Sequence, residues 1–135
     1  MLMAVAVLAL SLMFGIIAHE LSHSIALRVF GIDHDVQWLS DRSGRGVFRA
    51  GIRGRWAHVD LRDLTNDVAP WKLRVAALMP LLLIVPLLTI PAGLIVDPFQ
   101  TGNLVLVLGI VGWMACAIPS PADFAIFWHP HDALH

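Results

Sequence analysis

The chain has 135 residues, of which 58% are hydrophobic and only 14% are charged. This balance excludes an ordinary soluble domain, whose surface needs polar side chains, so the lipid bilayer is the expected solvent. A formal net charge of -1 and the lack of a basic patch with interleaved aromatic residues argue against nucleic acid as a partner.

Three apolar stretches are long enough to cross a membrane, at about residues 3–28, 75–96 and 103–121. A cleavable signal peptide is the alternative interpretation of the first stretch. Signal peptides begin with a basic segment, however, and the first Lys or Arg here is Arg28. The expected fold class is therefore an α-helical membrane protein with three transmembrane helices, forming a single membrane-embedded core over residues 1–135.

The loop at residues 33–70 separates the first two stretches, and eight of the nine basic residues lie between these stretches. The positive-inside bias makes this loop cytoplasmic, which places the N-terminus outside and the C-terminus in the cytoplasm. Val36–Trp38, Gly46–Ile52 and Ala57–Leu61 favour strands and are separated by turn-rich residues. The loop is therefore predicted to form a small β-ribbon or sheet.

The second stretch is rich in prolines. Asp67 is expected to cap its helical beginning, with Pro70 in the first turn. Pro80, Pro86 and Pro91 lie further along and predict kinks, because proline has no N–H and crowds the preceding turn.

The motif His19-Glu20-Leu21-Ser22-His23 follows the first apolar run. Positions i and i+4 share one face of a helix, so His19 and His23 can offer two imidazole nitrogens to one metal ion. Glu20, the only glutamate in the chain, has the general-base position of metallopeptidases, where it would activate a zinc-bound water. Ionisable groups inside a span are costly and point to function.

The alternative is that the membrane span ends near Ala18 and leaves the motif at the interface as a wet helical end. Ile25, Ala26, Leu27, Val29 and Phe30 argue against this, because they continue an apolar helix past the motif.

Asp123 is the predicted third metal ligand, since it is the only carboxylate near the end of the third stretch. The third stretch runs in the same direction as the first, so Asp123 should reach the depth of the histidines. The alternative role for Asp123 is the N-cap of a short helix over Ala125–Trp128, and both roles can coexist. His129 and His131 are rival ligands, but their surroundings favour an exposed tail.

These residues resemble the site-2 protease family of intramembrane zinc metallopeptidases, or a small zincin branch of it. The likeness follows the chain in order. It comprises the motif at His19 to His23, the strand-like loop, Pro70-Trp71-Lys72 with Ala76 to Pro80, and finally Pro119, Pro121 and Asp123. The resemblance implies that His19, His23 and Asp123 bind Zn²⁺ and that Glu20 is catalytic.

Three positions depart from the family pattern. Met79 and Leu83 stand where the family usually has Gly and Asn, and Phe124 stands where it has Gly. The expected metal ligands are unchanged, so these departures bear on how substrate is held.

The predicted function is a zinc metalloendopeptidase that hydrolyses peptide bonds of membrane-embedded substrates. The partners would be such a peptide or protein segment, which the edge of the loop sheet could hold by strand addition, and the lipid bilayer itself. The alternative is a metal-binding membrane protein or transporter without hydrolysis. Transport needs polar residues along the spans, for which Ser11, Thr89 and Asn103 are the candidates.

Overall fold

A computed structural model of the protein describes residues 1–38, 57–61, 68–94 and 96–131. Within these ranges, three helical stretches are long and apolar enough to cross a membrane: Leu2–Val29, Pro70–Thr89 and Leu104–Trp128. The prediction of a mostly helical protein with three such stretches is confirmed. The elements are α1 (Leu2–Val29), β1 (His34–Trp38), β2 (Ala57–Leu61), α3 (Pro70–Leu78), the 3₁₀ helix η1 (Met79–Thr89), α4 (Pro98–Thr101), α5 (Leu104–Ala117) and α6 (Pro121–Trp128).

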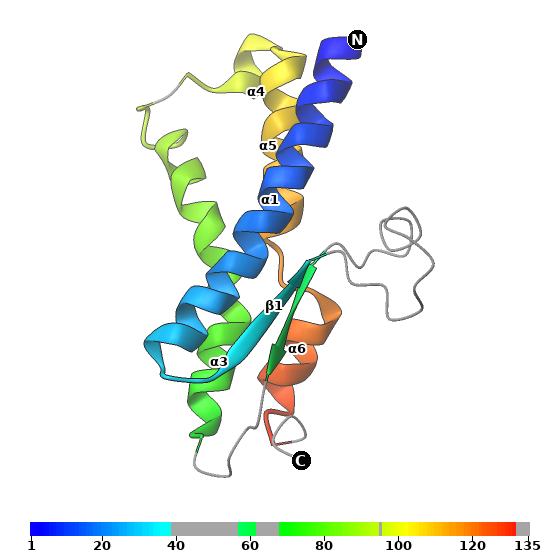
Figure 1. The fold of residues 1–135 in the computed structure, drawn as a ribbon. Helices are drawn as coiled ribbons and strands as arrows, with labels where there is room; N and C mark the ends of the chain where they lie inside the picture. Colours follow the sequence, from blue (N-terminus) through cyan, green and yellow to red (C-terminus); the bar gives the residue numbers. More distant parts are fainter. Residues whose placement is uncertain (39–56, 62–67, 95, 132–135) are drawn as a thin grey trace, which may run out of the picture.

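The helices form an elongated bundle in which α1 and α5 run in the same direction (Figure 1). The continuous pair α3 and η1 returns in the opposite direction and contacts both α1 and α5 through η1. α3 also packs against α6. The C-terminal end of α1 and the start of α6 therefore lie in the same half of the molecule.

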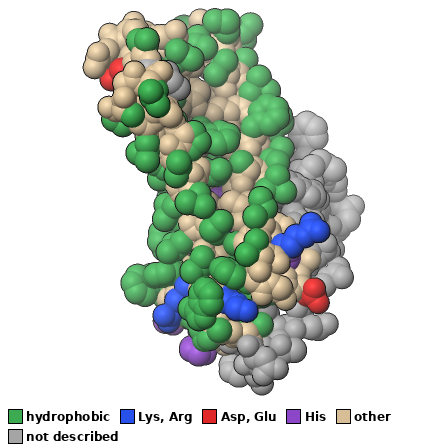
Figure 2. Space-filling model, turned by 90° about the vertical axis from the view of Figure 1, so that its left-hand side faces the viewer, with side chains coloured by type: hydrophobic (Ala, Val, Ile, Leu, Met, Phe, Trp, Pro, Cys, Tyr) green, Lys and Arg blue, Asp and Glu red, His purple; other side chains and the backbone are tan. Residues whose placement is uncertain are grey.

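The outer surface of the bundle is apolar. Large hydrophobic side chains on all three stretches are half exposed or more, among them Leu10, Phe14, Leu82, Leu88 and Leu106. Figure 2 shows hydrophobic side chains over most of one face, with Lys and Arg gathered toward the end that carries α3 and α6. A contiguous apolar surface of this kind suits contact with lipid chains rather than with water.

Small residues hold α1 close to α5. A Cβ atom added to Gly15 would lie 2.8 Å from both the Cβ and the Sγ of Cys116. One added to Gly112 would lie 3.1 Å from atoms of Leu8 and Ser11. The Ser11 hydroxyl also donates to the Gly109 carbonyl at 2.6 Å. Small residues at such interfaces let helix backbones approach closely in a membrane.

The second helical stretch, Pro70–Thr89, is shifted from the predicted 75–96. It begins earlier because Pro70 occupies the first helical position. It ends earlier because Pro91 has no N–H and Gly93 adopts a positive φ of 72°, although the sequence stays apolar.

The start and the middle of this stretch also differ from expectation. The N-cap of α3 is Ala69, whereas Asp67, the predicted cap, lies outside the described residues. In place of a single kinked α-helix, the chain changes to the 3₁₀ form at Met79 and keeps it past Pro80 and Pro86.

The third stretch is divided. α5 ends at Ala117, and α6 begins at Pro121, so a helix runs beyond the predicted boundary of residue 121. Pro119 and Pro121 explain the interruption, because neither can donate a backbone hydrogen bond to the preceding turn.

In the loop, β1 and β2 pair antiparallel, from His34 opposite Leu61 to Trp38 opposite Ala57. The predicted strand at Gly46–Ile52 lies outside the described residues. The described part of the loop is thus a two-stranded pair.

Candidate metal centre

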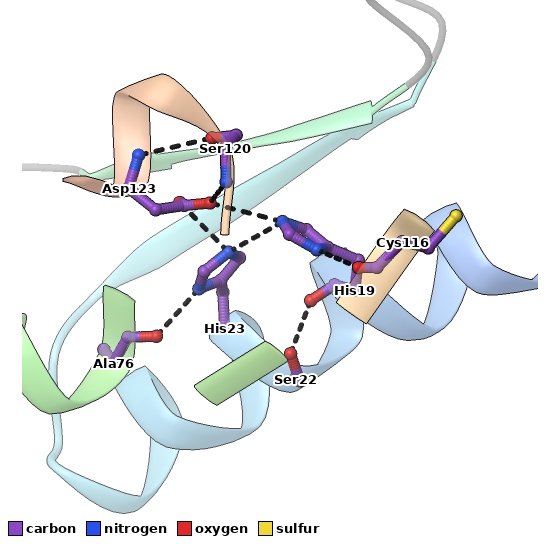
Figure 3. A network of polar contacts seen from close by, with 7 residues as sticks. All are labelled: His19, Ser22, His23, Ala76, Cys116, Ser120 and Asp123. Atoms are coloured by element: carbon purple, nitrogen blue, oxygen red, sulfur yellow. Dashed lines mark hydrogen bonds and ion pairs between the residues drawn. The ribbon is translucent and has the colours of Figure 1, made fainter. Parts of the chain in front are cut away.

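Helix α1 carries both histidines of the motif on one face, and the first turn of α6 brings Asp123 to them (Figure 3). All three residues are buried, with exposed fractions of 9% for His19, 7% for His23 and 8% for Asp123. α1 continues past the motif to Val29, as the apolar residues after His23 predicted. The first and the last of the described helices therefore meet at one buried polar cluster.

Both imidazoles are oriented by backbone carbonyl groups. His19 Nδ1 lies 2.7 Å from the Cys116 oxygen, and His23 Nδ1 lies 2.8 Å from the Ala76 oxygen. A carbonyl oxygen can only accept, so each Nδ1 must be the donor. In the neutral imidazole the other nitrogen, Nε2, then carries a lone pair. Histidines that bind metals are oriented in this way by their second nitrogen.

Helix breaks make these two carbonyls available. The regular helical partner of the Ala76 oxygen would be the N–H of residue 80, but residue 80 is proline. The Cys116 oxygen lies in the last turn of α5, where carbonyls lose their helical donors. Its regular partner would be Ser120, whose N–H donates instead to Asp123 Oδ2 at 2.6 Å. Proline positions thus prepare both histidine acceptors.

Asp123 is held by a capping box at the start of α6. The Ser120 hydroxyl accepts from the Asp123 N–H at 3.2 Å, and the Asp123 carboxylate accepts from the Ser120 N–H. The N-cap of this helix is therefore Ser120, and the predicted N-cap role of Asp123 before a helix at Ala125–Trp128 is wrong. Asp123 is the third helical residue, and the capping box fixes its carboxylate with both oxygens toward the histidines.

The distances within the cluster suit a tetrahedral metal ion. The two Nε2 atoms are 3.2 Å apart. Asp123 Oδ2 lies 3.3 Å from His19 Nε2, and Oδ1 lies 3.1 Å from His23 Nε2. A tetrahedron with zinc–ligand bonds of about 2.0–2.1 Å has edges of about 3.3–3.4 Å. Two imidazole lone pairs and a carboxylate that converge so closely repel one another unless a proton or a metal ion lies between them, and the distances are compatible with zinc.

Glu20 belongs to the same site. It is partly buried and lines a pocket of about 130 Å³ together with His23, Ser120 and Asp123. Glu20 therefore lies at the pocket through which a substrate and a water molecule could approach the ligands.

The rival histidines lie elsewhere. His129 is the exposed C-cap of α6, and His131 is exposed as well. His34 is occupied by local contacts, since its Nδ1 donates to the Ile32 oxygen at 2.9 Å and its Nε2 lies 2.6 Å from Ser24 Oγ. In the part of the chain that the structure describes, His19, His23 and Asp123 form the one group of at least three residues able to hold a metal.

Sequence reasoning missed the backbone acceptors at Ala76 and Cys116 and the cap at Ser120. A signal for the first was present, because Pro80 lies four residues after Ala76 and therefore removes the helical donor to its carbonyl. For Ser120, the signal was an Asp three residues later, which is a variant of the capping-box pattern.

No protein-family model, curated protein or solved structure matches this chain. The likeness to site-2 proteases therefore rests on the motifs and their arrangement in this chain, and membership of that family stays a prediction.

Proposed function

We propose that the chain is a zinc metallopeptidase of the site-2 protease type that hydrolyses peptide bonds in membrane-embedded segments. The observation that carries this proposal is the convergence of His19, His23 and Asp123 next to a pocket that Glu20 also lines. A structural zinc site is closed by four protein ligands, whereas a catalytic site has three and an open fourth position. Among the described residues, this cluster offers three potential ligands and has an adjacent pocket.

Zinc in such a site polarises a carbonyl group and acidifies water, which is the chemistry that peptide hydrolysis needs. The carbonyl bonds from Cys116 and Ala76 keep the two Nε2 atoms directed at the metal position. Glu20 would accept a proton from the water as its oxygen bonds to the scissile carbonyl carbon. The same carboxyl group would then return the proton to the amide nitrogen as the C–N bond breaks.

The position of the site supports a substrate within the membrane. His19 and His23 lie nine and five residues before Arg28, which corresponds to about 13 and 8 Å along a helix. Arg28 lies in the last turn of α1, and Lys72, near the beginning of α3, donates to the carbonyl of Phe30 just after α1. Figure 2 shows Lys and Arg toward this end of the bundle, which the positive-inside bias assigns to the cytoplasm. In the proposed topology the N-terminus is outside, and the loop at residues 33–70 and the C-terminus are cytoplasmic.

Metal transport is the competing function. The polar side chains that could line an ion path make other contacts instead. The Ser11 hydroxyl donates to Gly109 in the α1–α5 interface. The Thr89 hydroxyl donates to the Pro86 carbonyl within its own helix. The Asn103 side chain caps α5 by accepting from Leu106 N–H. These contacts favour helix packing and capping over an ion path, so hydrolysis is the better-supported function.

The decisive experiment compares Glu20→Gln with the unchanged chain after purification in detergent. Zinc content is measured by atomic emission, and cleavage is measured on a panel of single-span membrane proteins. We expect Glu20→Gln to retain zinc, because Glu20 is outside the proposed ligand set. Cleavage should fall by about 10²–10⁴-fold, the usual contribution of a general base.

Asp97→Asn is a matched control, since it also changes a carboxylate to an amide, but at the N-cap of α4 on the other end of the bundle. It should leave both zinc and cleavage unchanged. Zinc-dependent cleavage at the same rate in Glu20→Gln would contradict the assigned role. If the unchanged protein and Glu20→Gln take up zinc into vesicles equally and neither cleaves a substrate, transport would be established instead.

A further inference from the structure

The pocket beside the metal ligands is lined mostly by apolar residues, and the part of its wall that they form is termed the apolar end. Its walls come from three helices that pack together, namely α1, α3 and α6. Leu73 and Ala77 are almost fully buried, with exposed fractions of 1% and 4%. This part of the wall is therefore fixed by packing. The apolar lining residues are Leu27, Leu73, Ala76, Ala77, Ala122 and Ile126.

The size of the pocket limits what it can hold. Its volume is about 130 Å³. An apolar cavity of about 150 Å³ accommodates a benzene-sized molecule. An aliphatic side chain such as Val, Leu, Ile or Met therefore fits, whereas the two fused rings of an indole are too large. A charged side chain at the apolar end would lose its hydration without gaining a partner there.

Helix α6 links this apolar end directly to the proposed chemistry. Ala122 precedes the ligand Asp123, and Ile126 follows it by three residues, so one helix supplies both the carboxylate and part of the apolar wall. Glu20 and His23 line the same pocket. A side chain in the apolar end would therefore place its own backbone next to the metal ligands and Glu20.

We propose that the apolar end is a specificity pocket for one aliphatic side chain adjacent to the scissile bond. This inference rests on the proposed peptidase function and narrows its substrates. The substrates are membrane segments that carry a residue of the size of Val, Leu, Ile or Met at the position flanking the cut. Segments with Trp or a charged residue at that position are cleaved poorly.

The first test measures cleavage of one transmembrane substrate with Ala, Leu or Trp at the residue flanking the mapped cut site. We expect the unchanged enzyme to prefer Leu over Trp by at least about 10-fold in kcat/KM, the scale of discrimination in apolar pockets. Ile126→Ala enlarges the pocket and should reduce this preference by about 10-fold. Ala122→Leu adds volume to the pocket wall and should lower cleavage of the Leu substrate more than that of the Ala substrate.

Ile25→Ala is the matched control for Ile126→Ala. Ile25 is 57% exposed on α1 and is not among the lining residues, so its truncation should leave the Leu-to-Trp ratio unchanged. An identical ratio in the unchanged enzyme, Ile126→Ala and Ala122→Leu would overturn the specificity pocket while leaving the peptidase function intact.

The second test uses binding, so that it does not depend on hydrolysis. Zinc-loaded Glu20→Gln is titrated with short peptide hydroxamates that carry an Ala, Leu or Trp side chain, and affinities are measured by calorimetry. A Leu preference that Ile126→Ala weakens supports the pocket, even if no substrate is cleaved and the peptidase function fails. Equal affinities that all rise after removal of bound lipid would identify a lipid chain as the occupant and overturn the proposal.

Discussion

The two halves of the bundle are stabilised by different means. The half built from the beginning of α1 and from α5 relies on shape, since Gly15, Gly109 and Gly112 let the two helices approach closely. The other half, where α1 meets α3 and α6, contains the buried side chains of His19, His23 and Asp123. The first half is sensitive to added volume, and the second is sensitive to any change in polar partners.

The close helix packing and the candidate metal site therefore lie in different halves of the bundle. Among the described residues, no buried side-chain nitrogen or oxygen lacks a hydrogen-bond partner. In the polar half, backbone carbonyls that helix breaks have left available pair with both Nδ1 atoms, and the two Nε2 atoms contact each other and Asp123. A polar group inside a low-dielectric region is costly when it is unpaired, so this half tolerates few substitutions. The close-packed half, by contrast, needs only small side chains at the contact.

The largest effect is expected from removing the carboxylate of the polar half. Asp123→Ala should weaken zinc binding by more than about 100-fold, because loss of a direct ligand exceeds the 10–100-fold losses seen for outer-shell partners. Chelator competition in detergent measures the affinity. Asp97→Ala removes a carboxylate at the opposite end and serves as the control. Equal zinc affinity in Asp123→Ala and the unchanged protein would remove Asp123 from the ligand set.

A smaller effect is expected from adding volume to the close-packed half. In Gly15→Val the new Cβ meets the Cβ and Sγ of Cys116 at 2.8 Å, so one helix must shift. Overpacking of this kind should lower the free energy of unfolding by about 1–3 kcal/mol, measured by denaturant titration in micelles. Ala9→Val, at an exposed position of α1, should change it little. A stable Gly15→Val protein would show that the α1–α5 contact adapts.

Pro80→Ala should have the smallest effect, and it should separate zinc affinity from stability. The new N–H of residue 80 would compete with His23 for the Ala76 carbonyl, so zinc affinity should fall by about 10-fold. Stability should hold or rise, since alanine favours a helix. Pro86→Ala, which restores an N–H further along η1, is the matched control and should leave zinc affinity unchanged. If zinc affinity falls equally in Pro80→Ala and Pro86→Ala, Pro80 acts only through helix stability.

The sequence was most informative where pattern and chemistry coincide. The three apolar stretches predicted the three helices, and the spacing of His19 and His23 predicted their shared face. The direction of the stretches also predicted that Asp123 would arrive near the histidines, as it does in the structure. These inferences needed only helix periodicity and the alternation of direction between successive spans.

The remaining features depend on backbone geometry that apolar content does not encode. Hydropathy placed the second span too far along the chain, because it cannot register that Pro91 and Gly93 end the helix. The alternative role of Asp123 as an N-cap was wrong, because Ser120 holds that position and the turn between Ala117 and Pro121 is not visible as a sequence pattern. The carbonyls of Ala76 and Cys116 are main-chain groups, which a search of side-chain types overlooks.

The contact between His19 and Cys116 spans 97 residues of the chain, and the contact between His23 and Ala76 spans 53. A nascent chain that has inserted only α1 therefore carries the motif without the groups that orient it. The carboxylate that completes the cluster arrives last, with α6. Since chains are made from the N-terminus, synthesis itself delays assembly of the centre until α6 has been made. The chemistry proposed for this site would thus be silent during biogenesis and would begin only when the bundle closes.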